Sequence, residues 1–309
     1  MTATKTQNLL IYNPRAGMSV RRPKPADIMN ALGDETETDV MITAYPGHAK
    51  ELARRFGRDY RTVICCGGDG TLNEVVSGLR EAGIAPEIGY IPCGSTNDFA
   101  SNMGIPKRMP EAVSTILAGN VNACDAASFN DRTFTYIASF GPGVSVSFTT
   151  PQRVKNLIGY SAYMINGFGF NVIPTMRALK PKHIRVEYDG NVLEDDFYFG
   201  TVSNTLSAAG LFRFSKDEVR FNDGRFEVVL IRRLRHPMQM FSLLQKMRKH
   251  EYDGETLLHF QASHLRMHFD APEIWTLDGE ASGEVTDVEI RVQQKAVRLL
   301  CPNSVYFEK

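Results

Sequence analysis

Short apolar runs alternate with segments of helical periodicity from the first residues of the chain to about Asp125. The apolar runs predict strands at Asn8–Tyr12, Asp39–Thr43, Thr62–Cys66 and Glu87–Pro92. The periodic segments predict helices at Ala26–Leu32 and His48–Phe56, after Thr71, and at Thr96–Asn102. Strands and helices that alternate at this spacing favour an α/β domain with a parallel sheet and right-handed crossovers.

The clearest helix follows the loop Gly67–Thr71. One apolar stripe at spacings of three and four residues marks it, formed by Leu72, Val75, Val76 and Leu79. Thr71, with Glu74 three residues later, predicts a capping box at the start of this helix. Gly83 predicts its end, since glycine readily takes the left-handed conformation that closes a helix.

After Asp125 the pattern changes to that of a β-rich domain, and the domain boundary is placed near Asp125–Asn130 for this reason alone. Strands are expected at Thr133–Phe140, His183–Tyr188, Val192–Ser203, Phe226–Arg232, His264–Phe269 and Val285–Val292. Asp189-Gly190-Asn191 between two of them predicts a hairpin turn. Helices are expected at Lys155–Phe168 and Pro237–His250, and the whole half is interpreted as antiparallel.

Composition excludes several classes of protein. The chain has 309 residues, of which 43% are hydrophobic and 23% charged, which suits globular domains with real cores. Lys plus Arg equals Asp plus Glu at 35 each, so bulk attraction to nucleic acid is not expected. The five cysteines show no metal-binding spacing and the first residues are too polar for a signal peptide, which favours reduced thiols in a cytoplasmic protein.

Two segments invite a membrane interpretation. Asn156–Met176 carries no charge, but its asparagines, glycines and Pro174 make it too polar and broken to span a bilayer. We expect a buried or lipid-facing helix there that borders an acyl-chain site. Pro237–His250 is basic and amphipathic, and two interpretations stay open: docking at a membrane surface, or packing on the core with a solvated face.

The loop Gly67–Thr71 lies between a strand and a helix start, a setting typical of phosphate binding. Glycines let the backbone approach a ligand, and the helix N-terminus offers N–H groups and a positive dipole end. Asp69 would repel phosphate unless it acts through Mg²⁺, water or a ribose hydroxyl. The alternative is a tight turn without a ligand, and neither the Walker A nor the G-x-G-x-x-G pattern is present.

A second loop, Pro92–Phe99, follows the next predicted strand. Consecutive parallel strands end at the same edge of a sheet, so both loops would line one crevice. The small polar side chains of Ser95, Thr96, Asn97 and Asp98 could bind phosphate there. Plain helix capping by the same residues is the alternative.

Four ordered motifs together resemble the diacylglycerol kinase catalytic family, which also includes sphingosine, ceramide and phosphatidylglycerol kinases. They are Asn13-Pro14-Arg15-Ala16-Gly17, Gly67–Thr71 with Asn73-Glu74, Gly94–Ala100, and Thr276-Leu277-Asp278-Gly279-Glu280. The resemblance spans almost the whole chain. Ala16, where the family usually has Ser, and Ser95, in place of Thr, depart from the family pattern.

The resemblance implies a role for each motif. ATP would be bound by residues of the first three: Asn13, Arg15, Gly67, Gly68, Gly70, Thr71, Gly94, Ser95, Thr96 and Asn97. Mg²⁺ would be held by Asp69, Asp98 and Asp125. Catalysis would involve Asp69, Asp278 and Glu280, with Asp278 as the general base that accepts the proton of the substrate hydroxyl.

The resemblance also implies the domains and the reaction. We expect an α/β nucleotide-binding domain over residues 1–125, to which residues 295–309 return, and a β-rich, antiparallel and sandwich-like domain for the lipid over residues 126–294. The expected reaction is transfer of the ATP γ-phosphoryl group to a lipid hydroxyl, with diacylglycerol as the leading acceptor. The lipid would be met at the membrane surface by peripheral contact, and no nucleic acid is expected.

The sequence leaves several alternatives open. They are another lipid acceptor (a sphingoid base, ceramide or phosphatidylglycerol), a nicotinamide-dinucleotide kinase, and a non-catalytic lipid-binding protein. The second shares the Gly67–Thr71 pattern, but Asp278-Gly279-Glu280 and Asn97-Asp98-Phe99 favour the lipid kinase. The sequence names neither the acyl chains nor the oligomeric state, and a homodimer is one option.

Overall fold

The computed structural model describes residues 6–17, 22–33, 36–141, 180–208, 212–214, 218–249, 251–304 and 306–307. The expected helix Lys155–Phe168 and the uncharged segment Asn156–Met176 lie outside the described residues. The chain divides into two compact units, one made of Met1–Cys124 with Lys295–Lys309 and the other of Asp125–Gln294.

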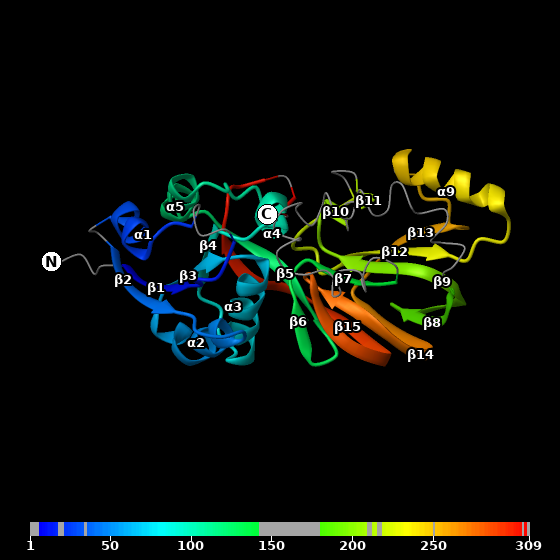
Figure 1. The fold of residues 1–309 in the computed structure, drawn as a ribbon, viewed down its shortest axis with the longest axis horizontal. Helices are drawn as coiled ribbons and strands as arrows, with labels where there is room; N and C mark the ends of the chain where they lie inside the picture. Colours follow the sequence, from blue (N-terminus) through cyan, green and yellow to red (C-terminus); the bar gives the residue numbers. More distant parts are fainter. Residues whose placement is uncertain are drawn as a thin grey trace. The chain divides into compact units, whose positions relative to one another are not determined.

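The first unit is built on a sheet in the order β15-β4-β3-β1-β2 (Figure 1). Four of its strands are β1 (Thr6–Tyr12), β2 (Thr36–Ile42), β3 (Thr62–Gly67) and β4 (Glu87–Pro92). The fifth position is taken by the end of β15 (Glu280–Leu300), which pairs with β4 through Arg298 and Leu299. The neighbouring strands of this sheet pair in parallel, and all residues of β3 and β4 are buried.

Helices cover both faces of this sheet (Figure 1). They are α1 (Pro25–Leu32), α2 (His48–Phe56), α3 (Asp69–Glu81), α4 (Asp98–Asn102) and α5 (Met109–Leu117), with a short 3-10 helix at Gly57–Asp59. The apolar sides of α1 and α5 pack with β1, β3 and β4 in one buried cluster. α2 and α3 lie against each other on the opposite face.

The two ends of α3 compare differently with the prediction. Its C-terminus is closed as expected, because Gly83 has φ of +66° and the N–H groups of Gly83 and Ile84 donate to the carbonyls of Arg80 and Leu79. The prediction of a capping box at its N-terminus is wrong. The helix begins at Asp69 with Gly68 as its N-cap and without a side-chain capping bond.

Glu74 caps a different helix. Its carboxylate accepts hydrogen bonds from the N–H groups of Gly47 and Ala49 at 2.8 and 3.1 Å, at the start of α2. A carboxylate in this place satisfies N–H groups that have no partner within the helix and also lies at the positive end of its dipole. The spacing of Thr71 and Glu74 is compatible with capping of α3 or of α2. The motif alone therefore could not identify the helix that Glu74 caps.

The second unit is an antiparallel sheet. Its strands are β5 (Val121–Phe129), β6 (Arg132–Phe134), β7 (Ile137–Phe140), β8 (Lys182–Tyr188), β9 (Asn191–Ser203), β12 (Phe226–Arg232), β13 (Leu257–Ala262), β14 (His264–Leu277) and most of β15. A separate two-stranded sheet joins β10 (Ser207–Ala208) to β11 (Phe212–Arg213), and α9 spans Pro237–Lys249. The protein is thus rich in sheet and divided in two, as expected.

The core of the second unit is aromatic. Trp275 is fully buried and its ring lies 4.8–6.0 Å from those of Phe129, Phe140 and Phe269. The predicted hairpin turn is present, since Asp189 and Gly190 both have positive φ between the paired residues Tyr188 and Asn191. The run predicted as one strand at Thr133–Phe140 is divided into β6 and β7.

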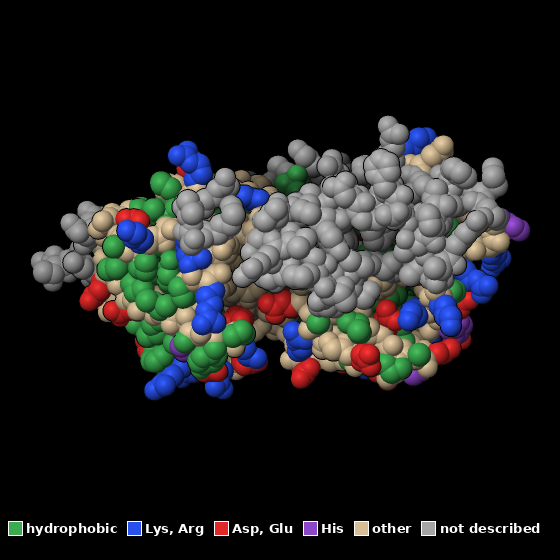
Figure 2. Space-filling model, in the orientation of Figure 1, with side chains coloured by type: hydrophobic (Ala, Val, Ile, Leu, Met, Phe, Trp, Pro, Cys, Tyr) green, Lys and Arg blue, Asp and Glu red, His purple; other side chains and the backbone are tan. Residues whose placement is uncertain are grey.

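Charged side chains of both signs are interspersed over the face that Figure 2 shows, in keeping with the equal numbers of acidic and basic residues. None of the helices in the described part of the chain has the length and apolar character needed to cross a bilayer.

Candidate active site

Three loops of the first unit meet at the carboxyl edge of its sheet, where β1, β3 and β4 end. The N–H of Asn13 donates to the carbonyl of Cys66 at 2.9 Å, and the N–H of Cys93 donates to the carbonyl of Gly67 at 2.7 Å. The parallel register of these strands therefore continues into the loops and brings the first three motifs together.

Glycines allow the loops to touch through their backbones. A β-carbon on Gly17, whose φ is +60°, would lie 2.0 Å from the carbonyl oxygen of Cys93. A β-carbon on Gly94 would lie 2.7 Å from the Cα of Gly68. Contacts this short exclude every side chain, so these glycines are required by the packing of the loops themselves.

Two asparagines predicted to bind the nucleotide hold the loops in place. The amide nitrogen of Asn13 donates to the hydroxyl of Thr71 at 2.8 Å, and its amide oxygen accepts the N–H of Arg15 at 2.8 Å. Asn97 is 5% exposed, has φ of 52°, and binds both the N–H and the carbonyl of Gly94. Their side chains serve to shape the loops.

Asp69 links the second loop to the third. Its carboxylate accepts the N–H groups of Asp98 and Phe99 at 2.9 and 3.3 Å, and the hydroxyl of Tyr90 at 3.3 Å. The first turn of α4 is therefore capped by Asp69. Its own N-cap residue, Asn97, makes no side-chain capping bond. The sequence predicted Mg²⁺, water or a ribose hydroxyl as partners of Asp69 and not these backbone N–H groups, which compensate part of the negative charge that would face a phosphate.

Asp98 lies beside a lysine that the sequence analysis did not identify. Burial raises the pKa of the Asp98 carboxyl, and the charge of Lys107 opposes this rise. The Lys107 ammonium group also donates to the carbonyl of Thr96 at 2.8 Å, whereas the side chain of Ser95 is exposed. A lysine outside the quoted motifs gives no sequence signal of its own, and only the fold brings it to this loop.

Asp125 belongs to the second unit and is 2% exposed. Its carboxylate accepts the N–H of Gly224 at 2.6 Å, and its own N–H donates to the carbonyl of Phe221 at 2.7 Å. Within the part of the chain that the structure describes, no three His, Cys, Asp or Glu side chains are grouped so as to hold a metal ion. Any metal bound by the predicted aspartates would therefore require ligands from another source.

Asp278 occupies the turn between β14 and β15. It has φ of 49° and, with Gly279, forms a two-residue hairpin turn. The residue is 5% exposed, and its carboxylate accepts hydrogen bonds from the N–H and hydroxyl of Thr135 and from the N–H groups of Tyr136 and Ile137. Burial raises the pKa of this carboxyl, and these hydrogen bonds oppose the rise.

The same contacts explain the division of the predicted strand Thr133–Phe140. Thr135, Tyr136 and Ile137 turn their N–H groups toward Asp278 at the junction of β6 and β7. Glu280, the other predicted catalytic residue of this motif, is exposed at the start of β15. These donors to Asp278 lie more than a hundred positions away in the chain and carry no motif.

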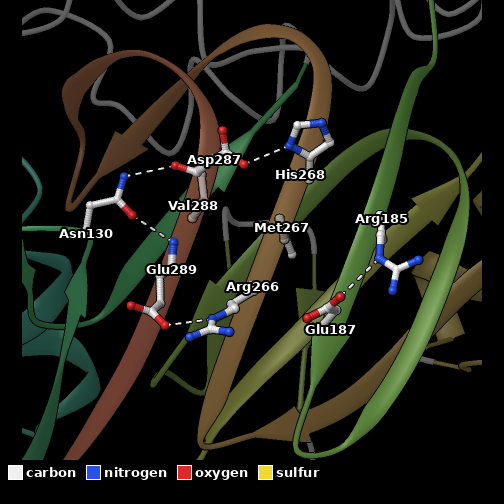
Figure 3. Close-up of a pocket in the computed structure, with 9 residues that line it drawn as sticks. All are labelled: Asn130, Arg185, Glu187, Arg266, Met267, His268, Asp287, Val288 and Glu289. Atoms are coloured by element: carbon white, nitrogen blue, oxygen red, sulfur yellow. Dashed lines mark hydrogen bonds and ion pairs between the residues drawn. The ribbon is translucent and has the colours of Figure 1, made fainter.

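A hollow of about 440 Å³ on the second unit contains none of the predicted site residues. It is lined by residues of β8, β14 and β15 with Asn130, and Figure 3 shows that its charged groups bind one another. Arg266 pairs with Glu289 at 2.8 Å, His268 with Asp287 at 2.7 Å and Arg185 with Glu187 at 3.0 Å. Because these charged groups are already paired with one another, nothing here marks the hollow as the active site.

Comparison with known proteins assigns the loops to a family. The diacylglycerol kinase catalytic domain family matches residues 7–129, which include the first three motifs. A diacylglycerol kinase of Staphylococcus saprophyticus subsp. saprophyticus is 29% identical to the chain over 308 residues, covering 97% of each protein. A diacylglycerol kinase of Staphylococcus aureus is 34% identical over 224 residues, which are 72% of this chain and 69% of the relative.

Solved structures share the fold. A crystal structure of a protein from Bacillus anthracis str. Sterne aligns with a TM-score of 0.79 at 22% identity and covers 98% of this chain and all of that one. The crystal structure of a diacylglycerol kinase from the same strain aligns with a TM-score of 0.70 at 18% identity, with 98% of each chain covered. These structures share the fold, and the sequence relatives show that the chain belongs to the diacylglycerol kinase family.

Proposed function

We propose that this chain transfers the γ-phosphoryl group of ATP to the hydroxyl group of a diacylglycerol and so makes phosphatidic acid. Its family makes it an ATP-dependent lipid kinase. Diacylglycerol is favoured as acceptor because the relatives that align over most of the chain are named diacylglycerol kinases. The acceptor would be met at a membrane surface, by peripheral contact.

The meeting of the three glycine-rich loops is the observation that carries the proposal. The first helical hydrogen bond of α3 runs from the N–H of Leu72 to the carbonyl of Gly68 at 3.1 Å. The N–H groups before Leu72 therefore precede the helical ladder and lie at the positive end of the helix dipole. The polar side chains around them hold the loops, so we propose that backbone N–H groups of the Gly67–Thr71 loop bind the phosphates of ATP.

Mg²⁺ is the proposed metal, with the carboxylates of Asp69 and Asp98 in the first unit as candidate ligands; a role for Asp125, of the second unit, stays a prediction from the resemblance. Carboxylate oxygens suit this ion, and ATP phosphates commonly supply further ligands. Burial raises the pKa of the Asp98 carboxyl, and a nearby cation would favour its charged form. Bound Mg²⁺ would neutralise charge on the phosphates during transfer.

Phosphotransfer to a panel of lipids tests the proposal. Purified protein would be given γ-labelled ATP, Mg²⁺ and vesicles that contain diacylglycerol, ceramide, sphingosine or phosphatidylglycerol in turn. We expect label in the diacylglycerol vesicles. Preferential label in another lipid would change the assigned acceptor, and no label in any of them would reject the proposal.

A glycine variant tests the proposed phosphate-binding loop directly, by its ATP affinity. Gly70→Val places a branched side chain in the first turn of α3, where the backbone would approach phosphate. We expect ATP binding, measured by calorimetry, to be lost while circular dichroism is retained. Ala85→Val adds similar apolar volume at the exposed Ala85, before β4 begins, and should leave ATP affinity unchanged. Equal affinity in the Gly70 variant would contradict the assigned loop.

A further inference from the structure

Two thiols meet at the base of the glycine-rich loops. Cys66 is the last residue but one of β3, and Cys93 immediately follows β4. Their Sγ atoms are 3.1 Å apart. A disulfide bond measures about 2.05 Å, so the two sulfurs need to approach by roughly 1 Å to be joined.

The two thiols differ in exposure and reactivity. Cys66 is fully buried, whereas Cys93 is partly exposed. The hydrogen bond with Cys66 and the charge of Arg22 lower the pKa of the Cys93 thiol, although burial opposes them. A lower pKa gives more thiolate, which is the form that attacks a disulfide. Cys65, the neighbour of Cys66 in β3, lies on the opposite face of the sheet because successive side chains of a strand alternate, whereas Cys66 and Cys93 share one buried cluster, so Cys65 is a poor competitor.

We propose that Cys66 and Cys93 form a reversible disulfide that weakens nucleotide binding. The oxidant is a small-molecule disulfide. The Cys93 thiolate attacks one of its sulfur atoms and releases one thiol, leaving a mixed disulfide on Cys93. Cys66 then loses its proton and attacks the Cys93 sulfur, which releases the second thiol. Two electrons pass from the protein sulfurs to the oxidant, and each half of the oxidant leaves as a thiol.

The loops transmit the effect, and this part of the inference rests on the proposed function. The carbonyl of Cys93 packs against Gly17, where even a β-carbon would not fit, and its N–H binds the carbonyl of Gly67. Gly94, the next residue, touches Gly68. A 1 Å displacement of the Cys93 sulfur toward Cys66 would therefore disturb contacts with both other loops.

Disulfide formation should lower ATP affinity, and bound ATP should disfavour the disulfide by the same factor. If the disulfide weakens ATP binding roughly tenfold, bound ATP shifts the disulfide equilibrium by the same roughly tenfold, because linkage is reciprocal. This reciprocity distinguishes a coupled pair of thiols from a cysteine pair that is oxidised without consequence.

The experiment equilibrates the protein in glutathione buffers of increasing disulfide content. One portion is alkylated at all free thiols under denaturing conditions for peptide analysis, and the other is kept folded for ATP binding. Mass spectrometry of peptides is expected to find Cys66 linked to Cys93. ATP affinity, measured by calorimetry, should fall roughly tenfold in the linked form and return after dithiothreitol. The Cys93→Ser variant should show equal affinity before and after oxidant, and the Cys66→Ser variant should keep glutathione on Cys93 without an internal link. The neighbouring control Cys65→Ala should respond as the parent does.

Each result has one meaning. Absence of the Cys66–Cys93 link in the most oxidising buffer, or a link without a change in ATP affinity, overturns the inference. A response to oxidant in Cys93→Ser overturns it as well. If the reduced protein binds no ATP, the proposed function fails, and the inferred effect on binding fails with it, even where the link is found. Success of the lipid assay without the link rejects the inference alone.

Discussion

At the scale of single residues, Asp278 combines two demands that a sequence motif cannot separate. Its backbone makes a left-handed turn, which Asn tolerates as well as Asp does. Its carboxylate also gathers four donors from Thr135, Tyr136 and Ile137 in a buried setting. An Asn in its place would satisfy the turn but would present an NH₂ group to at least one backbone N–H.

Asp278→Asn is therefore expected to lower both stability and activity. A buried donor left facing another donor should reduce the free energy of unfolding by about 1–3 kcal/mol. If Asp278 is also the general base, the rate per folded molecule should fall by ~10²–10⁴-fold with ATP affinity nearly unchanged. Thermal melting by circular dichroism and a lipid phosphorylation assay measure the two effects separately.

The control for this variant is Thr135→Val, which removes one hydroxyl donor but leaves the carboxylate in place. It should lower stability without the loss of rate per folded molecule. Normal turnover in folded Asp278→Asn would leave Asp278 as an anchor of the turn and remove it as the base.

Asp253, a second carboxylate of the second unit that accepts several hydrogen bonds, should make the stability of the protein depend on pH. It accepts hydrogen bonds from the Lys246 ammonium group and from the N–H groups of Glu255, Thr256 and Leu257. Burial alone would raise the pKa of this carboxyl, but these bonds lower it below its usual range. The stabilisation is thus complete above the unfolded-state pKa of about 4 and is lost as pH falls toward the folded-state value.

Asp253→Asn should accordingly lower the melting temperature near neutral pH, by the equivalent of about 1–3 kcal/mol. The difference from the parent should shrink as pH falls below about 4, because the unfolded parent chain then gains a proton on Asp253 while the folded state, with its lowered pKa, does not. The exposed Asp270→Asn serves as control and should have little effect at either pH. A difference that stays constant across this range would contradict the assigned hydrogen bonds.

At the scale of elements, α2 and α3 are held at very short distance by Gly78. A β-carbon there would lie 2.2 Å from the carbonyl oxygen of Lys50 in α2. Glu74, one turn earlier on α3, caps the start of α2. Thus α3 both packs against α2 and caps its N-terminus.

Gly78→Ala tests this contact. In an ordinary helix the change would stabilise by up to about 1 kcal/mol. Here the added methyl must push α2 and α3 apart, and we expect a net loss of about 1–3 kcal/mol. Chemical denaturation followed by circular dichroism measures it, with Ser114→Ala on the exposed side of α5 as the control. Increased stability would mean that the helices separate without strain.

The sequence predicted the bounds of helices and strands well where a single local residue pattern determines the element. α2 and β4 have the predicted bounds: α2 is an amphipathic run between Gly47 and Gly57, and β4 is a buried run that ends at Pro92. β13 was missed, and α5, a short helix after a proline-containing loop, was not predicted either. The three loops were predicted as neighbours of a site, but the partners of Asp69, Glu74 and Asp278 come from distant segments and could not be found in the sequence.

At the scale of the whole molecule, the chain leaves the first unit after Cys124 and returns to it at Lys295. The return occurs within β15, at a residue whose φ is 54°. Val297, Leu299 and Leu300 then enter the interior of the first unit, and Cys301 is tied to Asn120 and Asn122.

Removal of residues 295–309 should therefore disable the first unit. Without β15 the strand β4 becomes an unpaired edge, which favours aggregation, and its buried apolar partners are lost. We expect loss of ATP binding by calorimetry and faster hydrogen exchange in β4. A chain that ends at Ser304 keeps the strand and should behave as the parent. Undiminished ATP binding in the chain without residues 295–309 would show that the end of β15 is dispensable for the first unit.

This return also has a consequence for the order of events during synthesis. A domain at the start of a chain usually folds while the rest is being translated. Here the final strand of the first sheet emerges after all of Asp125–Gln294, a delay on the order of 10–30 s at common translation rates. During that interval the ribosome carries a nucleotide-binding sheet with an open β4 edge. A chaperone that covers exposed strands would thus be needed most by the half of the protein that is made first.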